Sequence, residues 1–300
     1  MESVAVFTHN VVPLYAEPNG AGEQVSQGLL GDEVQVLEPR ENFVHVRTAD
    51  GYAGWVRGIH LRTFASRDPL LSMTVHYPNA RPAIVGQAFA DVWEASDRNL
   101  MRTKLVWGTR VTLLDTFPQR TGNYSLVLLP GGAYGAPFSS PFFLGTVLSA
   151  ALEQPVQGSD FYGEAVCELA HRFIGTPYLW GGGTPFGFDC SGFVQRIYAV
   201  LGILLPRDAY LQAQSPRGKF QESGRRLRAG DLVFFAGPSD PRQRGITHVG
   251  IALDSRHFIH ACGSTGVTLS AFDDPAVCAA YTCRGAWRLT SPRTKTTQKV

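Results

Sequence analysis

The chain has 300 residues, 44% hydrophobic and 17% charged, so it is long enough for two or three globular modules and unlike a disordered protein. Its formal net charge is only +2 and its basic residues are scattered, which argues against a nucleic-acid or membrane partner. With 32 Gly and 19 Pro, turns and short strands are expected more than long helices.

Residues 1–6 have neither the basic n-region nor the long apolar core of a signal peptide, and no run approaches 18 apolar residues. We therefore expect a cytoplasmic protein without a membrane span, and the alternative is an exported protein whose leader has been removed. The five cysteines are Cys167, Cys190, Cys262, Cys278 and Cys283. Their odd number and irregular spacing fit reduced thiols better than a disulfide framework or a zinc site. A Cys278–Cys283 disulfide is the weaker alternative.

Residues 1–63 contain short runs of alternating polar and apolar residues, separated by turns. The runs are residues 4–7, 11–15, 33–37, 43–47 and 54–56. Period-two runs at this spacing predict a small β-barrel. This stretch resembles bacterial SH3-like (SH3b) domains, whose last core strand often reads Gly-Trp-Val, as at residues 54–56.

Residues 64–157 carry weaker strand signals. Runs at 88–93, 110–114 and 124–129 are flanked by Pro and Gly. We interpret this region as a second SH3b-like barrel, with the Gly/Pro-rich residues 130–141 as a loop or linker.

The pattern changes in residues 158–300. Ser159 can cap a helix with an apolar stripe ending near Gly175, and a second helix begins near Cys190 and runs to Gly202. Strand-like segments follow at residues 231–235, 248–253, 257–262 and 285–289. Helices first and antiparallel strands afterwards predict an α+β domain.

Cys190 stands where this second helix should start. A thiol at a helix N-terminus meets the positive end of the helix dipole and unpaired N–H groups, which favour the thiolate and can bind an oxyanion. The alternative for any single Cys is a small buried apolar residue.

His248 and His260 lie on two strand-like segments, symmetric about Asp254. A three-residue loop at residues 253–255 would place them directly opposite each other on one face, whereas a two-residue loop would separate them. On one face, His248 can act as base toward Cys190 while His260 orients it. The alternative for each His alone is a structural role.

Five blocks now carry a resemblance. They are residues 175–182 (GTPYLWGG), 188–194 (FDCSGFV), 205–208 (LPRD), 228–235 (RAGDLVFF) and 248–251 (HVGI). In this order they resemble the NlpC/P60 family of papain-like cell-wall peptidases. The family implies Cys190 as nucleophile, His248 as base and His260 as the third polar residue.

SH3b modules before such a domain resemble one subgroup, which cleaves the γ-D-glutamyl–diaminopimelate bond in peptides with a free N-terminal L-Ala. The subgroup implies that Asp189 binds the substrate ammonium, with Ser191 and Tyr178 shaping the pocket. Because an anion beside the thiol opposes thiolate formation, binding a cation there would offset that cost. Asp189 can equally serve as the N-cap of the helix.

The subgroup also implies an acid and a tyrosine from the first SH3b domain, for which Glu17 and Tyr52 are the candidates. Solvated loop residues are the alternative. Trp180 can wall the cleft or pack. Arg207 and Asp208 can line the site or form an ion pair without a catalytic part.

We therefore predict a multidomain protein: two SH3b-like β-barrels and a papain-like α+β domain that hydrolyses peptidoglycan-derived peptides during wall turnover. We expect no cofactor, no metal and a monomer. The alternatives are a wall-lytic endopeptidase anchored by SH3b modules, a non-catalytic wall-binding protein, and acyl transfer on the same scaffold.

Overall fold

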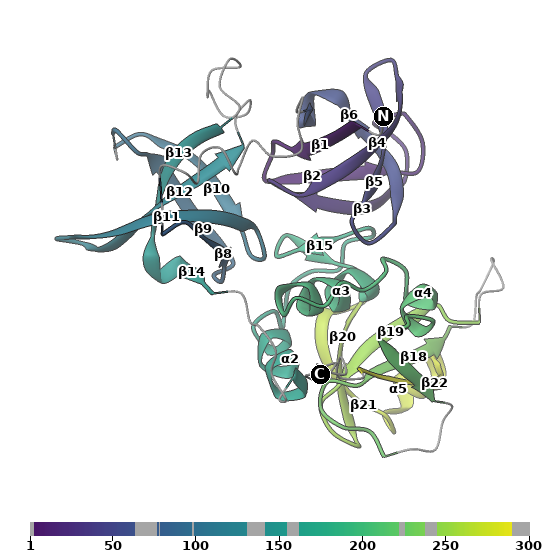
Figure 1. Cartoon of the computed structure of the whole chain (residues 1–300). Coiled ribbons are helices and arrows are strands. Elements are labelled where there is room, and N and C mark those ends of the chain that lie inside the picture. The colour runs from purple at the N-terminus through teal and green to yellow at the C-terminus, as the bar shows by residue number, and fades with distance from the viewer. Residues whose placement is uncertain are drawn as a thin grey trace, which may run out of the picture. The chain divides into compact units, whose positions relative to one another are not determined.

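The computed structural model describes residues 3–63, 77, 79–97, 99–130, 142–154, 162–221, 226–237 and 245–289 (Figure 1). The chain divides into two compact units, residues 1–156 with 179–188, and residues 157–178 with 189–300. The segment 179–188, which we call the Trp180 loop, therefore packs with the N-terminal unit. Within the described ranges, no helix is both long and apolar enough to cross a membrane.

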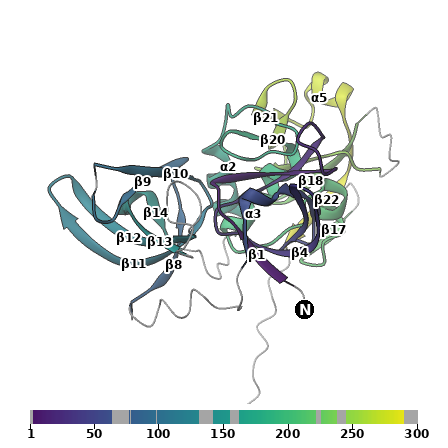
Figure 2. The ribbon, with the colours of Figure 1, turned by 90° about the horizontal axis from the view of Figure 1, so that it is seen from above.

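The N-terminal unit begins with a seven-stranded antiparallel sheet. Its strands are β1 (Ser3–Phe7), β2 (Val11–Tyr15), β3 (Gln24–Leu29), β4 (Glu33–Arg40), β5 (Phe43–Thr48), β6 (Ala53–Arg57) and β7 (Leu61–Thr63), in the order β3-β2-β6-β5-β4-β1-β7. Alternating residues of these strands, among them Phe7, Leu14 and Val56, are buried together as its core. The ribbon of this sheet is strongly curled (Figure 2).

A second seven-stranded sheet follows in the same unit. Its strands are β8 (Arg81–Val85), β9 (Phe89–Glu94), β10 (Met101–Val106), β11 (Arg110–Gln119), β12 (Gly122–Pro130), β13 (Phe142–Leu148) and β14 (Leu152–Glu153). The order β10-β9-β13-β12-β11-β8-β14 repeats that of the first sheet strand for strand. In both sheets a single 3-10 turn, Gly58–His60 or Ser149–Ala151, precedes the last strand.

Two closed barrels are not confirmed, because in the described residues the pairing runs from one edge strand to the other without joining the edges. The second core contains Val92, Leu105 and Val127, together with Leu30 from the turn after β3. The predicted linker at residues 130–141 lies, apart from Pro130, outside the described residues.

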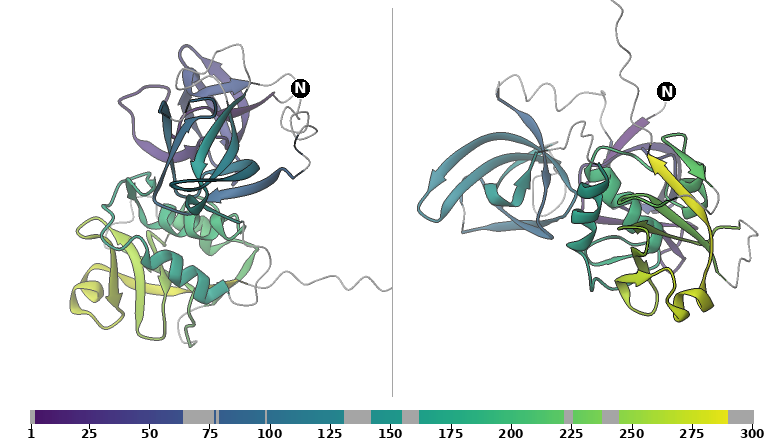
Figure 3. Two further views of the ribbon diagram at one scale, coloured as in Figure 1. Left: turned by 90° about the vertical axis from the view of Figure 1, so that its left-hand side faces the viewer. Right: turned by 90° about the horizontal axis from the view of Figure 1, so that it is seen from below.

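The C-terminal unit is an α+β fold, as predicted. Its helices are α2 (Tyr162–His171), α3 (Cys190–Val200), α4 (Ala209–Ala213) and α5 (Pro275–Ala280). Its strands are β17 (Gly218–Gln221), β18 (Leu232–Ala236), β19 (His248–Ala252), β20 (His257–Cys262), β21 (Gly266–Ala271) and β22 (Thr282–Leu289). They form one antiparallel sheet in the order β17-β22-β18-β19-β20-β21, and α3 packs on β19 and β20. In Figure 3, the teal and green helices of this unit lie against its yellow-green strands.

The predicted helix at 190–202 and the predicted strands at 231–235, 248–253 and 257–262 are confirmed to within two residues. Helix α3 is largely buried, and Phe193 and Ile197 are fully covered. The proposed cap Ser159 lies outside the described residues. The short elements α4, α5, β17 and β21 were not predicted.

Candidate active site

Cys190 is the first residue of α3, as the sequence indicates. Asp189 caps the helix: its Oδ1 accepts a hydrogen bond from the Gly192 N–H at 2.7 Å, and its carbonyl accepts one from the Phe193 N–H at 2.9 Å. The N–H groups of Cys190 and Ser191 belong to the first turn of α3, where no carbonyl of the helix itself can accept from them, and the Ser191 N–H lies against the Cys190 thiol. N–H groups at a helix start can donate to the oxyanion that forms on a carbonyl attacked by the Cys190 sulfur.

The two predicted histidines meet. His248 begins β19 and His260 lies in β20, and His248 Nε2 is 2.7 Å from His260 Nδ1. Both side chains are buried, at 5% and 2% exposure. Their placement on one face is confirmed, since α3 packs on the same two strands.

The predicted register of this hairpin is wrong. Ile251 pairs with Ile259 and Ala252 with Phe258, and the Leu253 N–H donates to the His257 carbonyl, so the loop is residues 254–256. His248 and His260 are therefore diagonal neighbours, two positions out of direct opposition. Because side chains alternate with a period of two, a shift of two positions keeps both on the same face.

Gly250 makes this diagonal contact possible. On that register it stands opposite His260, and a Cβ at this position would lie 3.2 Å from His260 Cβ and 2.8 Å from a Phe258 ring carbon. With only hydrogen there, the His260 ring has room to lean toward His248. A glycine inside a strand often marks such a close approach, and this signal was present in the sequence.

Ser270 of β21 extends the histidine pair. Its Oγ is 3.0 Å from His260 Nε2. If Nδ1 of His248 is to accept a proton, Nε2 must carry the hydrogen and donate to His260 Nδ1, and His260 Nε2–H then donates to Ser270. The three side chains form a hydrogen-bonded row that leaves Nδ1 of His248 as the basic atom.

Tyr281, which follows α5, covers the histidine pair. Its ring stacks on His248 at 4.5 Å between centroids and an interplanar angle of 16°. Phe235 lies 5.9 Å from the same imidazole on β18. No sequence signal pointed to Tyr281, because its contact with His248 joins residues far apart along the chain. The aromatic cover limits water around the base.

Burial keeps both the Cys190 thiol and the His248 imidazole neutral before substrate binds. It raises the pKa of Cys190 to about 12, and the Asp189 charge adds to that rise, against the Val249 N–H, the Arg207 charge and the Ser191 N–H. Burial, with a contribution from His260, lowers the pKa of His248 to about 3. The preformed thiolate expected from the helix start is thus outweighed by desolvation, and the proton must pass from Cys190 to His248 during the reaction.

A charged pair lies at the start of α3, because Asp189 directly precedes Cys190. Arg207 Nη1 donates to Asp189 Oδ1 at 3.0 Å, and Nη2 bonds Oδ2 of the same carboxylate. Arg207 also donates to Ser191 Oγ at 2.9 Å. Arg207 is 3% exposed, so this is a buried bidentate ion pair. Of the two predicted roles of Asp189, helix capping is confirmed, and its charge is already compensated.

Tyr178 also belongs to this group. Burial raises its pKa, and so do the charges of Cys190 and Asp189, which places the phenol near the nucleophile. Asp208 is the N-cap residue of α4, where its carbonyl, not its carboxylate, accepts hydrogen bonds from Leu211 and Gln212.

The Trp180 loop belongs to the other unit. Trp180 is 58% exposed, and its indole N–H donates to Glu23 Oε1 at 2.8 Å. Glu23 was not singled out in the sequence. Glu17 is exposed and accepts a hydrogen bond from Asn19, and Tyr52 lies in the turn before β6. A role for Glu17 and Tyr52 in closing the cleft stays a prediction.

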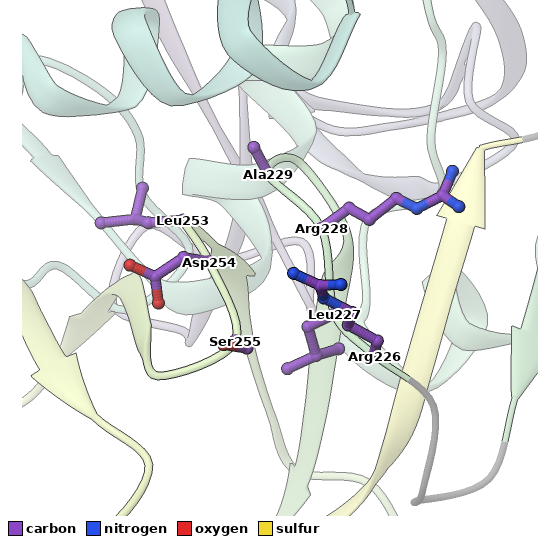
Figure 4. A pocket seen from close by; sticks show the side chains of 7 residues that line it. All are labelled: Arg226, Leu227, Arg228, Ala229, Leu253, Asp254 and Ser255. Atoms are coloured by element: carbon purple, nitrogen blue, oxygen red, sulfur yellow. The ribbon is translucent and has the colours of Figure 1, made fainter.

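A cavity of about 380 Å³ lies elsewhere in the C-terminal unit. It is lined by residues 226–229 and 253–255, with Asp254 facing Arg226 and Leu227 across it (Figure 4). It is at the loop end of β19, whereas His248 is at the opposite end of that strand. None of the predicted site residues lines it, so it is not the candidate active site. In the described part of the chain, no three His, Cys, Asp or Glu side chains gather as a metal site.

Comparison with known proteins matches two family models. Residues 175–285 match the NlpC/P60 family, and residues 14–61 match the bacterial dipeptidyl-peptidase SH3 domain. The first match contains Cys190, His248 and His260.

Two curated relatives cover most of the chain. Dipeptidyl-peptidase 6 of Lysinibacillus sphaericus is 29% identical over 275 residues, which cover 90% of this chain and 92% of the relative. The gamma-D-glutamyl-L-lysine dipeptidyl-peptidase of Bacillus cereus (strain ATCC 10987 / NRS 248) is 28% identical over 254 residues, which cover 80% and 68%.

A solved structure shares the fold. The crystal structure of an NlpC/P60 family protein from Bacillus cereus ATCC 10987 aligns with a TM-score of 0.76 at 22% identity, over 97% of this chain and 100% of that chain. Residues 175–285 are therefore an NlpC/P60 domain, and residues 14–61 are a bacterial dipeptidyl-peptidase SH3 domain.

Proposed function

We propose that this chain is a cysteine endopeptidase that hydrolyses the γ-D-glutamyl–diamino acid bond of cell-wall peptides with a free N-terminal L-Ala. The observation that carries it is the hydrogen-bonded pair His248–His260 on strands packed against α3, which begins at Cys190. Two relatives covering most of the chain are named as dipeptidyl-peptidases, one acting at a gamma-D-glutamyl-L-lysine linkage.

The reaction proceeds through an acyl-enzyme. His248 Nδ1 takes the thiol proton as Cys190 Sγ attacks the γ-carbonyl carbon, and the N–H groups of Cys190 and Ser191 donate to the resulting oxyanion. His248 then protonates the leaving amine as the C–N bond breaks. Water attacks the thioester with His248 as base, which restores the thiol.

Asp189 is also proposed to bind the substrate ammonium, and there it would act together with Arg207. Both carboxylate oxygens already bond Arg207. An ammonium would therefore share a carboxylate that is charge-compensated, and its contribution to binding would be smaller than that of an unpaired anion. Glu17 and Tyr52 remain the proposed contributors from the first SH3 domain.

The matching strand orders and the matching 3-10 turns support the second sheet as a second SH3b-like module. The five free cysteines support a reducing, cytoplasmic location for the protein. A monomer is proposed as well, and size-exclusion chromatography with light scattering tests it.

The test of function uses two peptides, L-Ala-γ-D-Glu-diaminopimelate and the same peptide with its L-Ala amine acylated. Mass spectrometry should show release of L-Ala-D-Glu from the first only, and none from either with Cys190→Ala. Equal cleavage of the acylated peptide would instead support the wall-lytic alternative. A Cys190→Ala variant as active as the wild type would refute the mechanism. Peptides with lysine in place of diaminopimelate report the third-residue preference.

A further inference from the structure

The Trp180 loop lies within the peptidase sequence, although it packs with the N-terminal unit, and it ends directly before Asp189 and the nucleophile. At its base, the Leu179 N–H donates to the Phe188 carbonyl at 3.1 Å. Two short strands, β15 (Gly183–Thr184) and β16 (Gly187–Phe188), pair within it. The loop is thus closed on itself, and its two ends continue into Tyr178 and into Asp189 and Cys190.

Strand β3, an edge strand of the first sheet, holds this loop through side chains. Gln27 Oε1 accepts hydrogen bonds from the Gly183 N–H at 2.9 Å and from the Thr184 hydroxyl at 3.2 Å. Gln24 Nε2 donates to the Trp180 carbonyl at 3.1 Å. Thr184 is fully buried, so the bond from its hydroxyl is shielded from water.

The backbones also approach closely at this point. Gly181 has a φ of +71°, and a Cβ there would lie 2.5 Å from the Gln24 carbonyl oxygen. Both the positive φ and the close approach to Gln24 require a glycine at this position, so the backbone of the loop is fixed where it passes over β3. A Cβ on Gly182 would in turn meet the Gly187 carbonyl oxygen at 2.4 Å. The loop therefore has little freedom to shift without losing its contacts to β3.

We propose that Gln27 is a positioning residue for Cys190, acting through the Trp180 loop. Phe188 is fully buried and directly precedes Asp189, which caps α3 and so sets where the helix, and with it the Cys190 sulfur, begins. Displacing the loop would displace this start. This inference rests on the proposed peptidase reaction. Through Gln27 the first SH3 domain would support catalysis without itself binding a ligand.

Both bonds of Gln27 use its oxygen as an acceptor, which allows a sharp test in the full chain. Gln27→Met keeps the shape and removes the acceptor, whereas Gln27→Glu keeps the acceptor. The matched control is Gln35→Met: Gln35 lies in the same sheet, and its Oε1 accepts from Arg47. For each variant we would measure kcat/KM on the free peptide, the thermal midpoint, and the rate of iodoacetamide modification of Cys190, read from its tryptic peptide.

Gln27→Met should lower kcat/KM and the alkylation rate of Cys190 by about tenfold relative to Gln35→Met, since a small misplacement of reacting groups has large effects on rate. Gln27→Glu should restore most of both. Thr184→Val removes only the hydroxyl donor and leaves the hydrogen bond from the Gly183 N–H to Gln27. It should lower kcat/KM and the alkylation rate less than Gln27→Met does, and it replaces Gln27→Met as the test variant if that protein does not fold.

Two results would overturn the proposal. One is a Gln27→Met variant that matches Gln35→Met in both rates, even with a lowered thermal midpoint. The other is a Gln27→Glu variant as impaired as Gln27→Met, since the acceptor would then be irrelevant. If the wild type cleaves no muropeptide, the proposed function fails, and the alkylation rates alone decide whether Gln27 positions Cys190.

Discussion

The candidate active site contains two buried polar pairs that differ in charge. His248 and His260 are joined by one 2.7 Å hydrogen bond, and burial lowers the pKa of each, so both rings are neutral. Asp189 and Arg207 form a bidentate ion pair. A neutral pair can take up and return a proton, whereas an ion pair holds its charges in place. The first therefore suits acid–base chemistry, and the second suits fixing the geometry of the helix start.

The largest expected effect is a loss of activity when the histidine pair is changed. His248→Gln removes the base while its amide can still donate to His260, so kcat should fall by about 10³-fold. The free energy of unfolding should change little, because no buried charge is exposed. Steady-state kinetics and urea unfolding check both, and an equal loss of kcat and stability would contradict a purely chemical role.

Arg207→Met tests the charged pair. It leaves Asp189 buried without its partner, which should lower the free energy of unfolding by about 3–5 kcal/mol. Adding Asp189→Asn should recover most of that loss, because the amide can still cap α3 and carries no charge. If the double variant is no more stable than Arg207→Met, the ion pair is not what stabilises this region.

A pH titration of stability sharpens the contrast. The folded pKa values of His248 and His260, about 3 and about 4, lie below the ordinary value of 6.5. Between these values the unfolded chain binds more protons than the folded chain. The contribution of the two histidines to the free energy of unfolding is therefore fully present above pH 6.5, and it is lost as the pH drops toward 4. Each histidine contributes up to about 1.4 kcal/mol per pH unit.

Urea unfolding at several pH values between 7 and 4 measures this slope. His260→Gln should flatten it. His60 in the N-terminal unit also has a pKa lowered to about 4 by burial, His9 and Arg57, so the comparison must be between variants. An unchanged slope in His260→Gln would mean that the pair does not stay neutral.

The smallest expected effect concerns the fit within the histidine pair. Gly250→Ala places a methyl group 3.2 Å from His260 Cβ, which should push that ring away from His248. We expect kcat to fall by about tenfold with a modest change in stability. Wild-type kcat in this variant would show that His260 reaches His248 without the space that Gly250 provides.

Much of this site could be predicted from local sequence. The start of α3 at Cys190 and the strands carrying both histidines follow from patterns that span a few residues. The register could not be fixed, because moving the loop by one position leaves every side chain on the same face. Strand β3 was missed because buried Ser26 and Gly28 interrupt its apolar pattern, and Gly28 is required where the Phe7 ring packs.

Contacts between distant residues were beyond local patterns. Tyr281 on His248, Ser270 beside His260 and Glu23 on Trp180 each join segments that only the fold brings together. The Arg207–Asp189 pair was also unexpected, because Arg207 and Asp208 were expected either to line the site or to form an ion pair without a catalytic part.

Strand β22 has a consequence for how the protein is made. It lies between β17 and β18 in the peptidase sheet, although it is the last of these strands to leave the ribosome. A nascent chain that already contains Cys190, His248 and His260 still lacks β22, the strand that joins β17 to β18. Translation through residue 289 must therefore precede a complete sheet, which delays a working protease until the peptidase sequence has been synthesised.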